Sequence, residues 1–171
     1  MLFGNPDKFA FLMEKTPEWC ANGFVNGLLY VYVNGEMFPK ELRTTTLSSD
    51  LLGLPNYAFA KLPEDEQLFT LPDNKLFEEL RRLRDPAWFA DNKEADEDYR
   101  FDIELSELGD CGYHIFAVSS KENVRIIIGY WVDLDNFELM NSAKITVEEF
   151  AKIRNGISEY YKTEICGGQN G

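Results

Sequence analysis

The chain has 171 residues, of which 44% are hydrophobic and 14% aromatic, and its 17 Lys and Arg against 30 Asp and Glu give a net charge of −13. This composition excludes a disordered acidic tail and supports a packed core, and the length is that of one domain. The negative charge weighs against a nucleic-acid partner, because a phosphate backbone repels such a surface, and it favours a basic protein partner.

Cysteine and histidine usage indicates a reducing compartment and no bound metal. The three cysteines, Cys20, Cys111 and Cys166, are far apart and odd in number, and the chain has neither a C-x-x-C pair nor a second histidine that would complete a metal site. No basic segment followed by an apolar run opens the chain, and the longest apolar stretches, Phe9–Met13 and Ile126–Val132, fall short of the ~20 residues of a membrane span. We therefore expect a cytoplasmic protein with no cofactor, no metal and no membrane partner.

The first half of the chain has the pattern of strands. A short apolar run covers Phe9–Met13, and a longer one, Leu28–Val33, ends in Asn34–Gly35. Asn-Gly tolerates the two positive φ angles of a type I′ turn, so Met37–Phe38 should pair back as a short strand before Pro39 stops it. The longer run is apolar on both faces, which predicts a central strand covered on both sides.

A helix is predicted over residues 74–84. Its apolar side chains share one face at helical spacing, and Asp73 just before it is of a residue type that caps helix N-termini. Pro86 should end the helix, because the residue before a proline is pushed out of the helical region. The apolar face consists of Leu76, Phe77, Leu80 and Leu83.

A second pair of strands and a second helix follow. Tyr113–Ser119 and Val124–Val132 are joined by a short polar loop of hairpin length, and alternate residues of the second run form one apolar face that should line the core. Thr146 and Glu149 then form a capping box that opens a helix over residues 146–161. Its buried stripe is predicted to be Phe150, Ile153, Ile157 and Tyr160.

This order of elements predicts an α+β fold. Strands and helices do not alternate regularly, as a parallel sheet would require, so we expect a mostly antiparallel β-sheet packed with two main helices, 74–84 and 146–161. No repeat or linker divides the sequence. Residues 1–171 are therefore expected to form a single domain, with a mobile glycine-rich tail from about residue 167.

Catalytic chemistry finds little support among the residues. His114 is the only histidine and lies within a predicted strand, while Cys111 lies between two glycines that favour a turn. Asp133 and Asp135 would face the same way in extended chain, but no further oxygen ligands for a cation can be placed beside them. We expect no catalytic residue. The alternative is a small hydrolase that uses His114 with Cys111 or with Asp133 and Asp135.

More than half of the net charge lies in residues 85–110, which carry −8. Trp88 and Phe89 stand beside the densest acidic stretch of this segment. One interpretation is a solvated loop. The other is a binding edge in which an aromatic anchor and carboxylates steer a basic partner. The predicted partner-binding residues are Trp88, Phe89, Asp91, Glu94, Asp96, Glu97 and Asp98.

The stretches Met1–Ala10, Asn26–Gly35 and Thr44–Leu51, with Ile128–Trp131 as a compatible fourth, resemble the immunity protein 42 family of bacterial polymorphic toxin systems. The acidic middle of the chain does not match it. The resemblance implies a small cytoplasmic protein that is made beside a secreted toxin, binds that toxin and blocks it without doing chemistry. It assigns no role to any single residue.

The charge and the family resemblance lead to the same function. An acidic protein without a catalytic constellation suits the stoichiometric inhibition of a basic toxin such as a nuclease, whose phosphate-binding cleft attracts carboxylates. We therefore predict an immunity protein that binds a cognate toxin domain through an acidic surface. A generic acidic interaction or scaffold module is the alternative.

Overall fold

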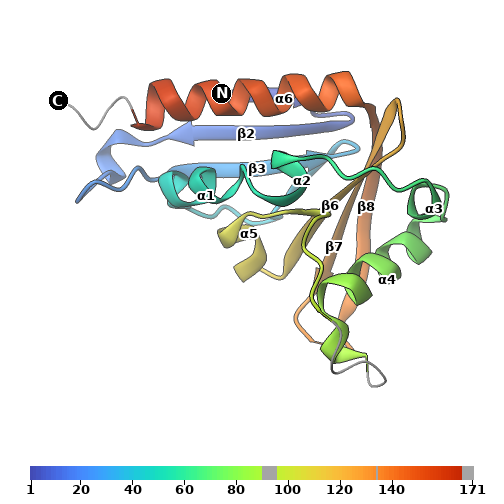
Figure 1. Cartoon of the computed structure of the whole chain (residues 1–171). Coiled ribbons are helices and arrows are strands. Elements are labelled where there is room, and N and C mark those ends of the chain that lie inside the picture. The colour runs from blue at the N-terminus through green and yellow to red at the C-terminus, as the bar shows by residue number, and fades with distance from the viewer. Residues whose placement is uncertain (90–95, 134, 167–171) are drawn as a thin grey trace.

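The computed structural model describes residues 1–89, 96–133 and 135–166, and the strands in these residues form two four-stranded sheets (Figure 1). Neighbouring strands are antiparallel throughout both sheets, which confirms the α+β class, although the strands divide between two sheets. In spatial order the first sheet contains β1 (Leu2–Asn5), β2 (Phe9–Lys15), β3 (Gly27–Val33) and β4 (Glu36–Phe38). The second contains β5 (Asp102–Ile103), β6 (Tyr113–Ser119), β7 (Asn123–Trp131) and β8 (Phe137–Thr146).

Helices connect and cover the two sheets. The two long helices, α4 and α6, confirm the two predicted ones. In Figure 1, α6 lies along the first sheet beside β2. Strands β7 and β8 run across the direction of β2 toward the narrow end of the molecule, where α4 ends. In the described residues the α-helices are α1 (Leu47–Gly53), α2 (Tyr57–Ala60), α3 (Glu66–Phe69), α4 (Asp73–Arg84), α5 (Ser106–Asp110) and α6 (Val147–Tyr160). Short 3-10 turns cover Pro17–Trp19 and Pro86–Trp88, and a π-helical turn covers Tyr161–Cys166.

The predicted hairpin of the first half is confirmed. Asn34 and Gly35 have φ angles of 50° and 84°, the two positive values of a type I′ turn, and they join β3 to β4. As predicted, β3 is central, because it pairs with β2 on one side and with β4 on the other. None of its side chains is exposed, which explains why its sequence is apolar on both faces.

The start of α6 also agrees with the prediction. The Thr146 side chain accepts a hydrogen bond from the Glu149 backbone N at 3.0 Å, and the Glu149 carboxylate accepts one from the Thr146 N at 2.7 Å. This reciprocal capping satisfies two of the backbone donors that a helix start leaves unpaired. All four residues of the predicted stripe are buried.

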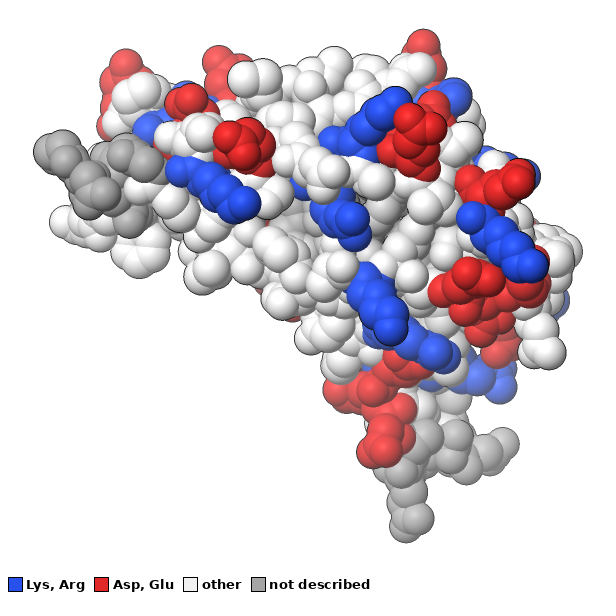
Figure 2. Space-filling view, turned by 45° about the horizontal axis from the view of Figure 1, so that its top comes forward, with Lys and Arg blue, Asp and Glu red and all other residues white. Residues whose placement is uncertain are grey.

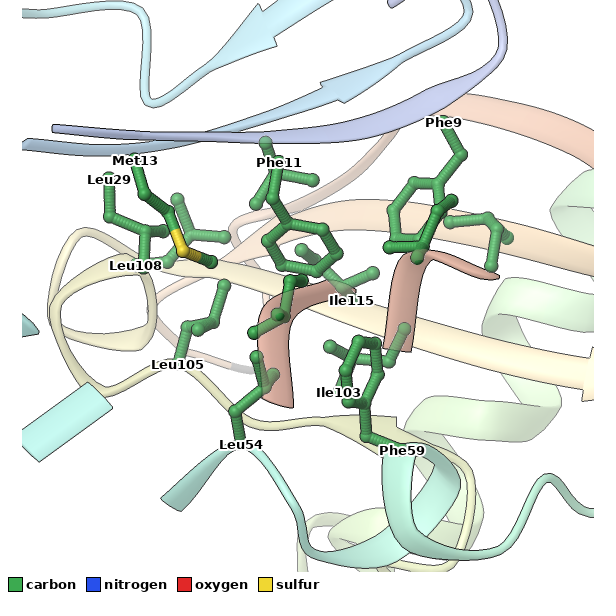
Figure 3. Packing of buried hydrophobic residues seen from close by; sticks show 14 of the residues in the cluster. Phe9, Phe11, Met13, Leu29, Leu54, Phe59, Ile103, Leu105, Leu108 and Ile115 are labelled. Atoms are coloured by element: carbon green, nitrogen blue, oxygen red, sulfur yellow. The ribbon is translucent and has the colours of Figure 1, made fainter. Parts of the chain in front are cut away.

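The main core lies between the first sheet, one face of the second sheet, and helices α1, α2, α5 and α6. Burial of these aromatic and aliphatic side chains is the chief favourable term in folding. Figure 3 shows side chains from β2 facing side chains from the α1–α2 region, β5, the start of α5 and β6: Phe9, Phe11 and Met13 on one side, and Leu54, Phe59, Ile103, Leu105 and Ile115 on the other.

A second core covers the opposite face of the second sheet. Leu76, Phe77 and Leu80 of α4 pack there against β6 and β7, with Ile127 and Trp131 among their neighbours. Strand β7 is therefore buried on both faces, so the face predicted from alternate residues is only one of its two core faces. Val132, the last residue of that predicted face, follows the strand and is 57% exposed.

The predicted cap of α4 is wrong. Asp73 is the first helical residue rather than the N-cap, and its carboxylate forms an ion pair with Arg125 of β7 and accepts a hydrogen bond from the Ser142 hydroxyl of β8. Arg125 also donates to the backbone oxygens of Phe69 at 2.6 Å and Leu71 at 2.5 Å. These charge-assisted bonds to the sheet replace the local cap and hold the α3–α4 connection in place.

The remaining fold expectations concern the chain end and membranes. The predicted tail from residue 167 lies outside the described residues. Among the helices that are described, none has the length and apolar character that crossing a bilayer would require.

Candidate functional site

Three arginines, Arg81, Arg82 and Arg84, occupy the last turn of α4, where the helix dipole favours positive charge. The helix ends after Arg84, as predicted from Pro86, and the chain turns away through Pro86–Trp88. This stop leaves the Arg84 side chain beside β5 and β6 of the second sheet.

Arg84 joins groups from three elements. Its Nε lies 2.7 Å from Asp102 Oδ2 of β5, and its Nη1 lies 2.7 Å from His114 Nδ1 of β6. The guanidinium carbon lies 5.7 Å from the ring centre of Tyr99 and 5.4 Å from that of Trp131. Arg84 is therefore fixed by an ion pair and two aromatic rings, and it fixes Asp102 and His114 in turn.

Asp102 is a buried carboxylate that is only partly satisfied. The residue is 7% exposed, and burial raises its pKa to about 7, although the charge of Arg84 acts in the opposite direction. Its Oδ1 is buried and has no hydrogen-bond partner among the described residues. A buried oxygen in this state can accept a donor from outside the chain.

His114 is neutral at pH 7. Its ring stacks on Trp131 with 3.6 Å between ring centres, and burial, assisted by the charge of Arg84, lowers its pKa to about 3. Because a guanidinium only donates, Nδ1 of His114 is the acceptor toward Arg84 and the ring proton is on Nε2. The imidazole therefore adds no positive charge to its surroundings.

Helix α5 is held in place by a buried carboxylate from α1. Asp50 is 2% exposed and accepts hydrogen bonds from the backbone N of Ser106 at 2.7 Å and of Glu107 at 3.4 Å. Its second oxygen accepts from the Thr45 hydroxyl. These bonds satisfy donors at the start of α5 and fix this helix next to β6.

A hollow of about 380 Å³ opens between α5, β5 and β6. Arg84, Asp102 and His114 line it together with the exposed residues Glu104 and Asp110. Three of these five side chains are carboxylates and only Arg84 carries positive charge. Because Asp102 has a raised pKa and pairs with Arg84, the exposed Glu104 and Asp110 give this hollow its negative charge toward an entering group.

A second hollow of about 350 Å³ adjoins the first and shares Arg84, Asp110 and His114 with it. It continues to Trp88 and Val132, which are 38% and 57% exposed. We call the two hollows together the cleft. One half of the cleft is acidic, and the other half exposes large apolar side chains of the kind that anchor protein interfaces.

The aromatic residues near the cleft pack around a second arginine. Arg81 is 3% exposed, and its guanidinium carbon lies 3.8 Å from the ring centre of Phe137 and 5.8 Å from that of Phe89. Burial lowers the pKa of Arg81, and its Nη2 has no hydrogen-bond partner among the described residues. Of the two aromatics predicted as anchors, Trp88 is exposed, whereas Phe89 is half-buried against Arg81 and Arg82.

The described part of the predicted acidic stretch returns to the end of α4. The backbone N of Asp98 donates to the Leu83 oxygen at 2.8 Å, and the Asp98 carboxylate pairs with Arg100 at 2.9 Å. Asp96 and Glu97 are exposed, and Glu97 accepts a hydrogen bond from Tyr99, whose ring also faces Arg84. The acidic stretch and the cleft therefore belong to the same end of the molecule.

Two predicted partner-binding residues cannot be placed. Asp91 and Glu94 lie outside the described residues. Among the described residues, Asp85 of the same segment lines the second hollow, and burial raises its pKa.

The residues proposed for a hydrolase do not come together. Cys111 lines a different, small cavity beside Leu29 and Pro39, and burial raises the pKa of its thiol. Asp133 accepts hydrogen bonds from the backbone N of Asp135 and of Asn136, both at 2.9 Å, which is the geometry of a turn rather than of a ligand site. His114 is thus grouped with Arg84 and Asp102 instead.

Side chains of the types that bind metal ions do not cluster in the described residues either. Across residues 1–89, 96–133 and 135–166, no group of three or more His, Cys, Asp or Glu side chains is arranged to hold a metal ion.

Sequence reasoning missed most of the cleft. Asp102, Glu104 and Asp110 were counted only as charges of the acidic segment. The alternation of acidic and apolar residues from Asp102 to Leu105 was nevertheless a signal that Asp102 and Glu104 share one face. The meeting of Arg84 with His114 spans 30 positions and had no local signal.

Charge is unevenly distributed over the surface. On the face shown in Figure 2, Lys and Arg side chains cross the middle of the molecule, whereas a group of Asp and Glu side chains lies beside the narrow end. A basic partner would be attracted to that end rather than to the middle of this face.

Comparison with known proteins places the chain in a family. The family model for immunity protein 42 matches residues 1–160, which include the acidic middle that the resemblance in the sequence did not cover. Among solved structures, the crystal structure of CdiI from Burkholderia dolosa AUO158 has the same fold, with a TM-score of 0.75 and 23% sequence identity over 93% of this chain and 99% of that one. No curated protein sequence matches the chain. Because the family model spans nearly the whole sequence, the chain belongs to the immunity protein 42 family.

Proposed function

We propose that this protein binds a cognate toxin domain in the cytoplasm and neutralises it by stoichiometric protein–protein interaction. Membership of the immunity protein 42 family supports the class of function. The observation that carries the proposed mode of binding is the cleft, in which carboxylates and an exposed tryptophan lie side by side.

The toxin is proposed to be basic, as a nuclease would be. The segment 85–110 carries a net charge of −8, and its residues Asp85, Asp102, Glu104 and Asp110 line the cleft. Fixed negative charge raises the rate at which a positive partner arrives, and the exposed Trp88 gives that partner an apolar contact once it has arrived. The proposed contact residues remain Trp88, Phe89, Asp91, Glu94, Asp96, Glu97 and Asp98, and we add Glu104, Asp110 and Val132 because they line the cleft.

Neutralisation is proposed to need no catalysis by this chain. The Nδ1 lone pair of His114 is engaged by Arg84, and its low pKa leaves little basicity for proton abstraction. Neither Cys111 nor Asp133 lines the cleft with it. The cleft is therefore better suited to binding charge than to activating a nucleophile.

Charge reversal tests this proposal. Asp96, Glu97 and Asp98 are changed together to Lys, and the affinity for the toxin domain encoded next to this gene is measured at low and high salt. We expect at least a tenfold weaker complex and slower association, with the larger effect at low salt.

A matched control separates local from overall charge. Glu14, Glu159 and Glu164 are exposed on β2, on α6 and beyond its end, so their reversal to Lys changes the net charge by the same amount. This control should stay within about threefold of the wild type. Equal weakening by both triple variants would show that only net charge matters. A wild-type protein that does not bind the neighbouring toxin would favour the scaffold alternative.

A further inference from the structure

We infer that the acidic half of the cleft receives the guanidinium or ammonium group of one basic side chain of the toxin. This inference rests on the proposed function and names the contact at its centre. This hollow was not among the predicted contacts, which were Trp88, Phe89 and the carboxylates of residues 91–98.

The carboxylates are placed to surround a cation. The buried Asp102 lines the hollow, and the exposed Glu104 and Asp110 also line it. Asp102 is more than nine-tenths buried, and its Oδ1 lacks a hydrogen-bond partner among the described residues. An incoming N–H donor would satisfy an oxygen whose burial otherwise costs stability.

Positive charge already in the hollow is neutralised. Arg84 pairs with Asp102 at 2.7 Å and with Asp85 at 3.9 Å, so its charge is balanced within the chain. His114 carries no charge at pH 7. Among the described residues, neither of the exposed carboxylates Glu104 and Asp110 forms an ion pair, so their negative charge is open to solvent.

An organic cation fits better than a metal ion. In the described part of the chain, acidic side chains do not converge as a metal site requires. Arginine and lysine instead present several donors on a long flexible stem, which can reach separate carboxylates. The adjoining half of the cleft, with Trp88 and Val132 exposed, offers apolar contact that a protein surface could cover and a small free cation could not.

The test removes charge from the rim without changing its shape. The double variant Glu104→Gln/Asp110→Asn is compared with the control Glu14→Gln/Glu159→Gln, which loses the same charge at exposed positions outside the cleft. Calorimetry with the toxin domain should show at least tenfold weaker binding for the rim variant and less than twofold change for the control. A rim variant within twofold of the wild type would overturn the inference.

A second measurement uses a defined probe. L-argininamide added to the wild type should cause saturable NMR shifts in the amides of Glu104, Asp110 and His114, and the rim variant should abolish them. Shifts spread evenly over exposed acidic residues would overturn the inference.

If the wild type does not bind the toxin domain at all, the proposed function fails. A toxin complex that tolerates the rim variant overturns only the role of the hollow.

Discussion

The main core and the cleft end of the molecule differ in whether their buried polar side chains have hydrogen-bond partners. In the main core region, Thr45 and Asp50 are hydrogen-bonded to each other, and the Ser119 hydroxyl donates to the Pro63 oxygen at 2.8 Å. At the cleft end, in contrast, Arg81 Nη2 and Asp102 Oδ1 lack hydrogen-bond partners within the described chain. Arg84 Nε also lacks a hydrogen-bond partner within the described chain, because it forms an ion pair with Asp102 but is poorly directed for a hydrogen bond.

This difference separates stability from binding. Unsatisfied buried polar groups cost free energy, so a protein that keeps them gains something else, and binding surfaces are where such groups are commonly kept. The main core, which holds Phe9, Phe11 and Met13 at 0% exposure, can supply the stability that the cleft end loses. The following variants test this division.

Truncation in the main core should have the largest effect on stability. Phe11 is fully buried, and its ring packs against Phe9 and Phe59. Phe11→Ala should lower the free energy of unfolding by about 3–5 kcal/mol in urea denaturation, because it leaves a cavity. Toxin affinity of the folded fraction should be unchanged. Phe24→Ala, at a 55% exposed site, is the control and should cost well under 1 kcal/mol.

Acid should weaken the fold through His114. Its folded-state pKa of about 3 lies below the ordinary 6.5, so between these values the unfolded chain binds a proton that the folded chain does not, and stability falls as pH drops. In His114→Gln, the loss of unfolding free energy between pH 7 and pH 4 should be smaller by about 1–3 kcal/mol. Denaturation at both pH values measures this, and equal losses would contradict a buried neutral imidazole.

Asp102 should change the pH dependence of stability in the opposite direction to His114. Its folded-state pKa of about 7 lies above the ordinary 3.8, so its protonation stabilises the fold at low pH and that contribution is lost as pH rises through about 7. Asp102→Asn removes this gain and should lose more stability on acidification than the wild type does. The two variants therefore change the pH profile in opposite directions, which a general loss of structure would not produce.

Removal of Arg81, whose Nη2 has no hydrogen-bond partner among the described residues, should stabilise the protein. Arg81→Met keeps an unbranched apolar side chain at this buried position and removes a buried charge, so the free energy of unfolding should rise by about 1–2 kcal/mol even though the guanidinium over Phe137 is lost. Arg82→Met, at an exposed site of the same helix turn, should change it by less than 0.5 kcal/mol. A clear destabilisation by Arg81→Met would mean that the cation and the aromatic rings hold this end together.

The smallest effect is expected at the start of α6, on the stable side of the molecule. Thr146→Ala removes one half of the capping box and should cost about 1 kcal/mol in the same denaturation assay. Toxin affinity should not change. Thr163→Ala, beyond the end of α6, provides the comparison and should cost less.

Features of the fold that depend on residues close together in the sequence were predicted correctly. The capping box of Thr146 and Glu149 and the turn at Asn34 and Gly35 are short-range, since their partners lie within three residues. Asp73 was assigned wrongly because its partner, Arg125, lies 52 positions away on another strand. Strand β8 was not predicted because two apolar residues, Leu139 and Met140, followed by two polar ones, Asn141 and Ser142, break the alternation of its sequence.

The same limit applies to the site. Charge counting located the acidic segment, and Trp88 is exposed as an anchor should be. The hollow depends instead on α4, β5 and β6 bringing Arg84, Asp102 and His114 together, and no spacing in the sequence encodes that meeting. Burial then decides the chemistry, because it moves the pKa values of Asp102 and His114 in opposite directions.

Hydrogen–deuterium exchange of the protein with and without the neighbouring toxin domain measures where the toxin binds. The account predicts slower exchange in residues 84–89 and 102–114, which surround the cleft, and no change in β1 and β2. Protection confined to α6 and the first sheet, with the cleft end exchanging as in the free protein, would contradict it.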